Sequence, residues 1–388
     1  MSTLNSRQTA ALTRCGFVLA AIGTLVLLAA AGCVHHNAPV RALPIPVPPL
    51  SAESGQAINV GPVSRGEYVG NAACVPCHRD ISRVHAASNH ASTLRPMSHE
   101  AMAKVAPGTS DLPDTFFVFA SKPDGFYIQE AAGTDSSRKL EYSFGSGKHG
   151  ITFVSLGQDE KLFEMRSSYF PKEKRWGSTP GLEGMPPANS GLTFSDKASR
   201  ACFSCHTTNL PSNTSRPLSN AIGVGCESCH GGGGEHVKLM QHAKDQQAEI
   251  GIARLRSGGA TALDGMCIRC HQTTMVSNPF DSSLTMTARF APGDIERSRC
   301  FKESANSLDC TKCHDPHTNA ATDPRVYEKA CLNCHGTGAS ARTCRVNPNK
   351  GCIPCHMPHT EVLPGTSAKS SVPDHFIRIH PSKISPPT

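Results

Sequence analysis

The pentapeptide Cys-x-x-Cys-His occurs seven times in this chain of 388 residues. The copies, numbered motifs 1 to 7 in chain order, begin at Cys74, Cys202, Cys226, Cys267, Cys310, Cys331 and Cys352. The pattern is the covalent attachment signature of c-type haem, in which two thiols add across the haem vinyl groups and the next histidine binds the iron. The sequence therefore predicts seven covalently attached haems.

The motifs name the predicted attachment and proximal residues directly. The attachment cysteines are Cys74, Cys77, Cys202, Cys205, Cys226, Cys229, Cys267, Cys270, Cys310, Cys313, Cys331, Cys334, Cys352 and Cys355. The proximal iron ligands are His78, His206, His230, His271, His314, His335 and His356. Zinc knuckles and disulfides are the alternatives, but zinc would not require a histidine after every second cysteine, and disulfides would not require histidine at all.

The composition agrees with a fold in which haem supplies part of the apolar core. Hydrophobic residues make up 38% and aromatic residues 5%, which is little for a core of this size. Haem is a large apolar plate that takes the place of such side chains, so most of the C-terminal half is not expected to fold without it. The formal charge of +7 would be offset by the haem propionates, so it does not indicate nucleic-acid binding.

The N-terminal residues 1–33 have the pattern of a secretory leader. They contain Arg7 and Arg14, no acidic residue, and an apolar run over about 16–31. The run ends in LLAAAGC, which resembles the lipobox of bacterial lipoproteins, so Cys33 is predicted to be lipidated and to anchor the protein to a membrane. Ordinary signal cleavage near AAAG is the alternative, and both place the protein outside the cytoplasm, in the periplasm or at the cell surface.

The remaining chain divides by composition and motif spacing. Residues 34–65 are a Pro-rich tether, 66–112 a haem 1 segment, 113–195 a β-rich insertion and 196–388 a hexahaem domain. Motifs 1 and 2 begin 128 positions apart, whereas later intervals are 24, 41, 43, 21 and 21. We therefore expect a mainly α fold with extensive irregular loops organised around haems, and a small β-rich insertion after the first haem.

Two hairpins are predicted inside the insertion. FFVFASKPDGFYIQE indicates a strand, a Pro-Asp-Gly turn and a second strand, and GITFVSLGQDEKLFEMRSSYF repeats the scheme around Gly-Gln-Asp-Glu. The short later intervals leave room for little more than one short helix or loop per haem. Haems 2 and 3, and haems 5, 6 and 7, are therefore expected to lie close together.

The chain resembles multihaem cytochromes c, the superfamily of the ammonia-oxidiser tetrahaem cytochrome, hydroxylamine oxidoreductase and pentahaem nitrite reductase. The resemblance runs from about residue 68 to the C-terminus and is carried by YVGNAACVPCH, SFGSGKHG, GVGCESCHGGGGEH, CTKCHDPH and CIPCHMPH. In such proteins the distal ligand of one haem often comes from the segment of another. The resemblance implies six distal ligands, namely His90, His149, His236, His317, His359 and His375.

The seventh distal site has several candidates. They are His85, His99, His242, His380, Met97 and Met357, and an open site is a further alternative. The Cys-x-x-Cys-Lys motif of pentahaem nitrite reductases does not occur, and the crosslinking Tyr of hydroxylamine oxidoreductases is not identified. The leftover Cys300 and Cys344 would form a disulfide or stay unpaired.

We expect an electron-transfer cytochrome with no catalytic residues of its own. Its predicted partners are other redox proteins, either cytochromes or a membrane quinol-linked complex, docking through weak, partly polar interfaces. Two alternatives remain open. One is an oxidoreductase acting on a small nitrogen or sulfur compound at a five-coordinate haem, and the other is a structural subunit of a larger membrane complex.

Overall fold

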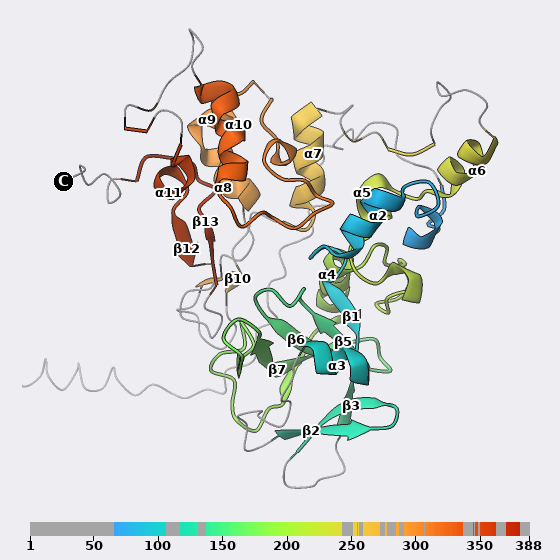
Figure 1. Cartoon of the computed structure of the whole chain (residues 1–388). Helices are drawn as coiled ribbons and strands as arrows, with labels where there is room; N and C mark the ends of the chain where they lie inside the picture. Colours follow the sequence, from blue (N-terminus) through green and yellow to red (C-terminus); the bar gives the residue numbers. More distant parts are fainter. Residues whose placement is uncertain are drawn as a thin grey trace, which may run out of the picture. The chain divides into compact units, whose positions relative to one another are not determined.

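An antiparallel sheet of six strands is the largest regular element of the computed structural model (Figure 1). Its path runs β1 (Leu94–Pro96), β5 (Tyr142–Phe144), β6 (Ile151–Leu156), β7 (Leu162–Phe170) and β8 (Arg175–Ser178), and β9 (Gly191–Thr193) pairs with β7. The predicted hairpin around Gly-Gln-Asp-Glu is confirmed as β6 and β7. Every pairing is antiparallel, so short connections suffice to build the sheet.

The structure describes most of the chain after residue 65. The described residues are 66–105, 117–130, 137–242, 251–253, 255, 259–271, 276–277, 285–286, 291–305, 307–336, 344, 346–347, 350–361 and 370–380. The predicted leader, Cys33 and the tether lie outside them. No helix of the described residues is long and apolar enough to cross a membrane.

A second sheet has three strands, β2 (Phe117–Lys122), β3 (Gly125–Glu130) and β4 (Ser137–Leu140). The predicted Pro-Asp-Gly hairpin is confirmed as β2 and β3, paired from Phe117 with Glu130 to Lys122 with Gly125. Gly125 closes the turn with a φ of 144°, a conformation that glycine reaches without a Cβ clash. Two further pairs of short strands are β10 (Val276–Ser277) with β11 (Thr285–Met286), and β12 (His359–Glu361) with β13 (Ser371–Pro373).

The expectation of a mainly α fold with a small β-rich insertion is wrong. The six-stranded sheet takes β1 from the segment after motif 1 and β8 and β9 from the Pro- and Gly-rich stretch before motif 2. Apolar alternation in the longer strands was recognisable, but three- and four-residue edge strands carry too few residues for a periodic signal. Pairing with β5 and β7, and not local pattern, makes these short segments extended.

Helices surround the motifs and are short. They are α2 (Arg79–Ala86), α3 (His99–Val105), α4 (Asp196–His206), α5 (Cys226–His230), α6 (Gly234–His242), α7 (Gly259–Ile268), α8 (Ala291–Arg297), α9 (Arg299–Glu303), α10 (Arg325–His335) and α11 (Cys352–His356). Three turns of 3-10 helix are η1 (Asn71–Ala73), η3 (Ser219–Ala221) and η5 (Cys310–Lys312). Isolated helices of this length are marginal in water, so packing must stabilise them.

The apolar core belongs to the sheets. One buried cluster joins both sheets through Phe126, Phe153, Met165 and Trp176 among others. The second places Phe203 of α4 against Leu94, Val154 and Leu162 of the six-stranded sheet, with Cys202 of motif 2 packed at its edge. Motif 2 therefore packs directly against the sheet, and its haem would contact the apolar core of the β region.

Glu164 is the one acidic residue of β7 and interrupts its apolar pattern. Its neighbours across the sheet are Val154 and Leu192, and Cys202 of motif 2 lies close to its carboxylate. Burial among these groups raises the pKa of Glu164 to about 7. The carboxyl group is therefore protonated in the folded chain at a pH where the unfolded chain has released the proton.

Glu164→Gln should remove a pH-dependent loss of stability. Between about pH 4.5 and 7 the folded protein binds the extra proton, so its stability falls as pH rises through this window. Glutamine does not titrate, so the variant should gain about 2 kcal/mol on the wild type between pH 4.5 and 8, after allowance for partial exposure. Thermal unfolding of the holoprotein at both pH values measures this, and a pH-independent difference would contradict it.

Candidate haem sites

Helical turns shape the Cys-x-x-Cys-His motifs. In motifs 1, 4 and 5 the histidine N–H donates to the carbonyl of the first cysteine over 2.9 Å, the i to i+4 bond of a helix. Positions i, i+3 and i+4 share one helix face, so both thiols and the imidazole point to the same side. This local geometry presents three groups together to one haem.

The cysteines are suited to neutral thioethers. Burial raises the pKa of Cys202 to about 12 and that of Cys229 to about 11, so the charged thiolate is disfavoured at both positions. A thioether carries no charge, so haem attachment leaves no uncompensated charge in these half-buried sites.

Four motif histidines face a histidine from elsewhere in the chain. The ring centres are 6.2 Å apart for His78 and His236, 6.0 Å for His271 and His90, 6.3 Å for His230 and His317, and 6.2 Å for His314 and His375. Each pair therefore combines one predicted proximal ligand with one predicted distal ligand from a different segment.

The separation fits one iron between the two rings. A metal–imidazole bond of about 2.0 Å, with the ring centre about 1.1 Å beyond the nitrogen, places two opposed rings about 6.2 Å apart. The four observed separations lie within 0.2 Å of this value. Three pairs have nearly parallel planes, at 14° to 29°, and the pair of His90 and His271 is steep at 75°.

Hydrogen bonds determine which ring nitrogen carries the proton in three of the distal candidates. Nδ1 of His90 donates to Pro316 O over 3.1 Å, and Nδ1 of His375 donates to Pro373 O over 2.9 Å. Nδ1 of His317 donates to Asp315 Oδ1 over 2.8 Å. Carbonyl and carboxylate oxygens only accept, so Nδ1 carries the proton and Nε2 keeps the lone pair that binds a metal.

Burial favours the neutral form of three of the paired imidazoles. It lowers the pKa of His230, His314 and His375, since each loses contact with water on folding. Only the neutral imidazole can bind iron, so the protein environment favours the ligating form.

Residues 186–231 match the protein family described as cytochrome c554 and c-prime. This span holds motifs 2 and 3, including the paired His230. The chain is related to the multihaem cytochromes c. Cytochromes of this kind bind haem c covalently, transfer electrons and exchange them with other redox proteins.

Two solved structures are distant likenesses of this chain. The outer cell wall cytochrome OcwA is 14% identical, with 80% of this chain and 79% of that chain covered and a TM-score of 0.43. An undecahaem cytochrome from the S-layer of Carboxydothermus ferrireducens is 16% identical, with 81% of this chain covered and a TM-score of 0.43. The chain studied here spans only 52% of that second chain. No curated protein sequence matches it.

His149 and His359 each contact a serine at the start of strand β13. Nδ1 of His149 is 2.6 Å from Ser370 Oγ, and Nδ1 of His359 is 3.1 Å from Ser371 Oγ. The structure thus brings the β-region turn of His149 to the C-terminal tail. Both histidines stay predictions as distal ligands.

The three remaining motif histidines have different surroundings. Nδ1 of His206 donates to Thr93 O over 3.0 Å, and its ring lies 4.5 Å from that of Phe144. Nδ1 of His356 donates to Arg378 O over 3.1 Å, and His335 ends α10. Both carbonyl partners orient the ring as expected of a metal ligand.

The other candidates for a seventh distal ligand lie in different surroundings. Met97 packs against the sheet core, and His99 uses both nitrogens, towards Lys122 O and Ser121 Oγ. His380 lies 3.8 Å from Asp374, His242 is exposed at the end of α6, and Met357 caps α11. His85 is buried in α2 close to His90 and His317, and burial lowers its pKa. Cys300 and Cys344 are free thiols.

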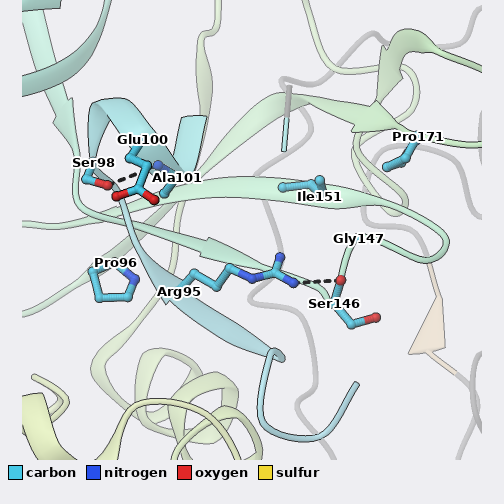
Figure 2. Close-up of a pocket in the computed structure, with 9 residues that line it drawn as sticks. All are labelled: Arg95, Pro96, Ser98, Glu100, Ala101, Ser146, Gly147, Ile151 and Pro171. Carbon is cyan, nitrogen blue, oxygen red and sulfur yellow. Dashed lines mark hydrogen bonds between the residues drawn. The ribbon is translucent and has the colours of Figure 1, made fainter. Parts of the chain in front are cut away.

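A cavity of about 590 Å³ is lined by residues of β1 and β6, among others (Figure 2). Arg95 of β1 crosses its wall and donates to the carbonyls of Gly145 and Ser146 over 3.1 and 2.7 Å. No motif cysteine or histidine lines it. A covalently held haem must stay beside its own cysteines, so this cavity is not one of the seven predicted sites.

One acidic residue that joins two motif segments, Glu227, was not predicted from the sequence. Glu227, inside motif 3, is buried and accepts hydrogen bonds from the backbone N–H groups of Val69, Gly70 and Gly233 over 2.8 to 2.9 Å. It ties the segment before motif 1 to motif 3. An acidic residue at a variable position of the motif, followed by four glycines, was the available signal.

Glu227→Ala should destabilise the holoprotein by about 3 kcal/mol, since three N–H donors, two of them in buried hydrogen bonds, lose their acceptor at about 1 kcal/mol or more each. Haem attachment should persist because the motif cysteines and histidine are intact. Thermal unfolding followed by circular dichroism measures the loss. Glu235→Ala, on an exposed residue of α6, is the control and should change little; equal stability of both variants would contradict the role of Glu227.

Proposed function

We propose that the chain is an extracytoplasmic carrier of seven c-type haems that passes electrons between redox partners. The observation that supports this best is the set of four histidine pairs at 6.0 to 6.3 Å, each suited to hold one iron from both sides. An iron with two axial imidazoles has no free position for substrate and serves electron transfer. Haem supplies the redox chemistry when bound.

The residues of the chain would hold each haem in place and fix the ligands of its iron. Cysteines fix each ring beside its own backbone, the paired imidazoles hold the coordination constant, and the carbonyl and carboxylate partners of Nδ1 orient each imidazole. Constant coordination keeps structural change small when an electron arrives or leaves. The proposed partners, cytochromes or a quinol-linked membrane complex, would dock transiently at exposed haem edges.

Electron paramagnetic resonance of the oxidised holoprotein, before and after addition of nitrite or hydroxylamine, tests this function. A carrier should show no change on either addition. If one high-spin iron binds the added molecule, the result would favour the alternative function, an oxidoreductase for a small nitrogen compound.

We further propose lipid anchoring through Cys33, which lies outside the described residues. Cys33→Ser should release the protein from membranes into the soluble fraction, because acyl chains on this residue would supply the binding energy. Fractionation followed by haem staining measures the release. Persistent membrane association of the variant would contradict the anchor without touching the electron-transfer proposal.

A further inference from the structure

His317 differs from four other candidate iron ligands in the group that accepts its ring proton. Nδ1 of His317 donates to the carboxylate of Asp315 over 2.8 Å. An aspartate is ionised at neutral pH, so a negative charge lies directly beside this ring. The acceptors of the other four are uncharged backbone carbonyls, namely Pro316 O for His90, Pro373 O for His375, Thr93 O for His206 and Arg378 O for His356.

A tight turn holds the Asp315 carboxylate in this place. The N–H of Thr318 donates to the carbonyl of Asp315 over 3.1 Å, which closes a four-residue turn directly after motif 5. Such a turn favours aspartate at its first position and proline at its second, here Asp315 and Pro316. Asp315 Oδ1 also accepts from the backbone N–H of His317 over 3.0 Å. One carboxylate oxygen therefore accepts two N–H groups of the same residue, which fixes its position.

Contacts with the segment after α2 hold this turn in place. Pro316 O accepts from Nδ1 of His90 over 3.1 Å, and Asn319 Oδ1 accepts from the N–H of Asn89 over 2.6 Å. Asn319 Nδ2 also donates to Ala87 O over 3.3 Å. The partners are 226 to 232 residues apart in sequence, so long-range contacts and the turn itself both determine where Asp315 lies.

The turn presents the His317 ring to motif 3. The ring centre is 6.3 Å from that of His230, and the two ring planes differ by 14°. Because Nδ1 donates to Asp315, Nε2 is the nitrogen that would bind the iron of haem 3. Water screens the charge of Asp315, whose side chain is 58% exposed, but it does not remove a direct hydrogen bond.

A charged acceptor changes how strongly an imidazole binds iron. The carboxylate draws the Nδ1 proton towards itself, so electron density at Nε2 rises and this nitrogen becomes the stronger donor. A stronger donor stabilises Fe(III), which carries the higher charge, more than it stabilises Fe(II). A hydrogen bond to a charged group is about twice as strong as one between neutral groups, so a carbonyl acceptor has a smaller effect.

We propose that Asp315 is a positioning residue that lowers the reduction potential of haem 3 through His317. The inference rests on the proposed carrier function, in which His230 and His317 hold one iron between them. It adds to that function a residue that sets the driving force for electron transfer at one haem. The sequence CTKCHDPH then serves two haems, because its motif attaches haem 5 while the Asp-Pro-His that follows coordinates and tunes haem 3.

Asp315→Asn in the intact holoprotein tests the inference. Asparagine favours the same turn and keeps an oxygen that accepts from Nδ1, but it carries no charge. One of the seven haems should become easier to reduce, with a change of about tenfold in its ratio of reduced to oxidised form, or about 59 mV. A redox titration followed by visible absorption and electron paramagnetic resonance measures this. Unchanged potentials of all haems would overturn the inference.

Two controls locate the effect. Asp323→Asn removes another carboxylate of the same segment, one that pairs with Arg325 over 2.7 Å, and should leave every ratio within about twofold. In a His317→Ala background Asp315→Asn should cause no shift, because the imidazole that carries the effect is missing. A shift that persists in this background would overturn the inference, since Asp315 would then act through space. An equal shift in Asp323→Asn would overturn it as well.

Failure of the proposed carrier function would give a different result. Mass spectrometry of each variant counts the haems, and a wild-type count below seven contradicts that function whatever Asp315 does. His317→Ala should give one high-spin iron. If it leaves every iron low-spin, His317 is not a ligand and the inference about Asp315 is overturned, while a full count of seven haems still supports the carrier.

Discussion

Replacing His236 with alanine is expected to convert one iron from low spin to high spin while every haem stays attached. Attachment requires only the Cys-x-x-Cys-His motif, which the substitution leaves intact. His236 lies in α6, and its ring is 6.2 Å from that of His78, the separation that places one iron between them. Removing one imidazole leaves that iron with His78 alone, and five-coordinate iron is high-spin.

Electron paramagnetic resonance and the visible absorption spectrum measure the change, and intact mass measures attachment. His242→Ala is the matched control, because His242 is an exposed histidine at the end of the same helix. The control should keep the wild-type spectrum. A His236→Ala spectrum that also matches the wild type would remove His236 from the ligands and with it the assignment of the first pair.

A chain produced without haem should keep its sheets and lose the structure of its C-terminal half. The largest buried apolar side chains of the described residues, among them Phe153, Phe170 and Phe203, all lie between residues 94 and 203. After residue 221 the buried apolar side chains of the described residues are Ala260, Ala262, Leu263 and Ile353. These few groups bury too little surface to hold short helices in place, so haem must supply the remaining apolar contact.

Limited proteolysis with mass mapping measures this difference when the chain is made in the cytoplasm, where haem is not attached. Cleavage should concentrate after residue 221 and spare the segment that holds both sheets. The holoprotein, treated in parallel, should resist cleavage in both regions. Equal resistance of the haem-free chain along its whole length would contradict the view that haem forms the C-terminal core.

The sites were more predictable than the fold, and the reason is chemical. Iron coordination needs particular side chains at fixed spacing, so the motifs and their proximal histidines are visible in the sequence. The distal partners are set by long-range packing, and resemblance to multihaem cytochromes was needed to propose them. Among these, four face a motif histidine, namely His90, His236, His317 and His375, and His149 and His359 stay predictions.

The extent of the β region could not be predicted for a different reason. Strands β1 and β9 have three residues each and take their conformation from β5 and β7. A segment that short carries no periodicity, and its partners lie about 25 to 50 residues away in sequence. The role of Glu227 was hidden similarly, since the backbone groups that it binds precede motif 1.

Intact-mass spectrometry of the mature holoprotein tests the central claim most directly. The account predicts a chain that carries seven covalently attached haems, one at each Cys-x-x-Cys-His motif. Peptide mapping should find a modified pair of cysteines at every motif and an unmodified thiol at Cys300 and Cys344. A mass with six or fewer haems, or a motif peptide with two free thiols, would contradict it.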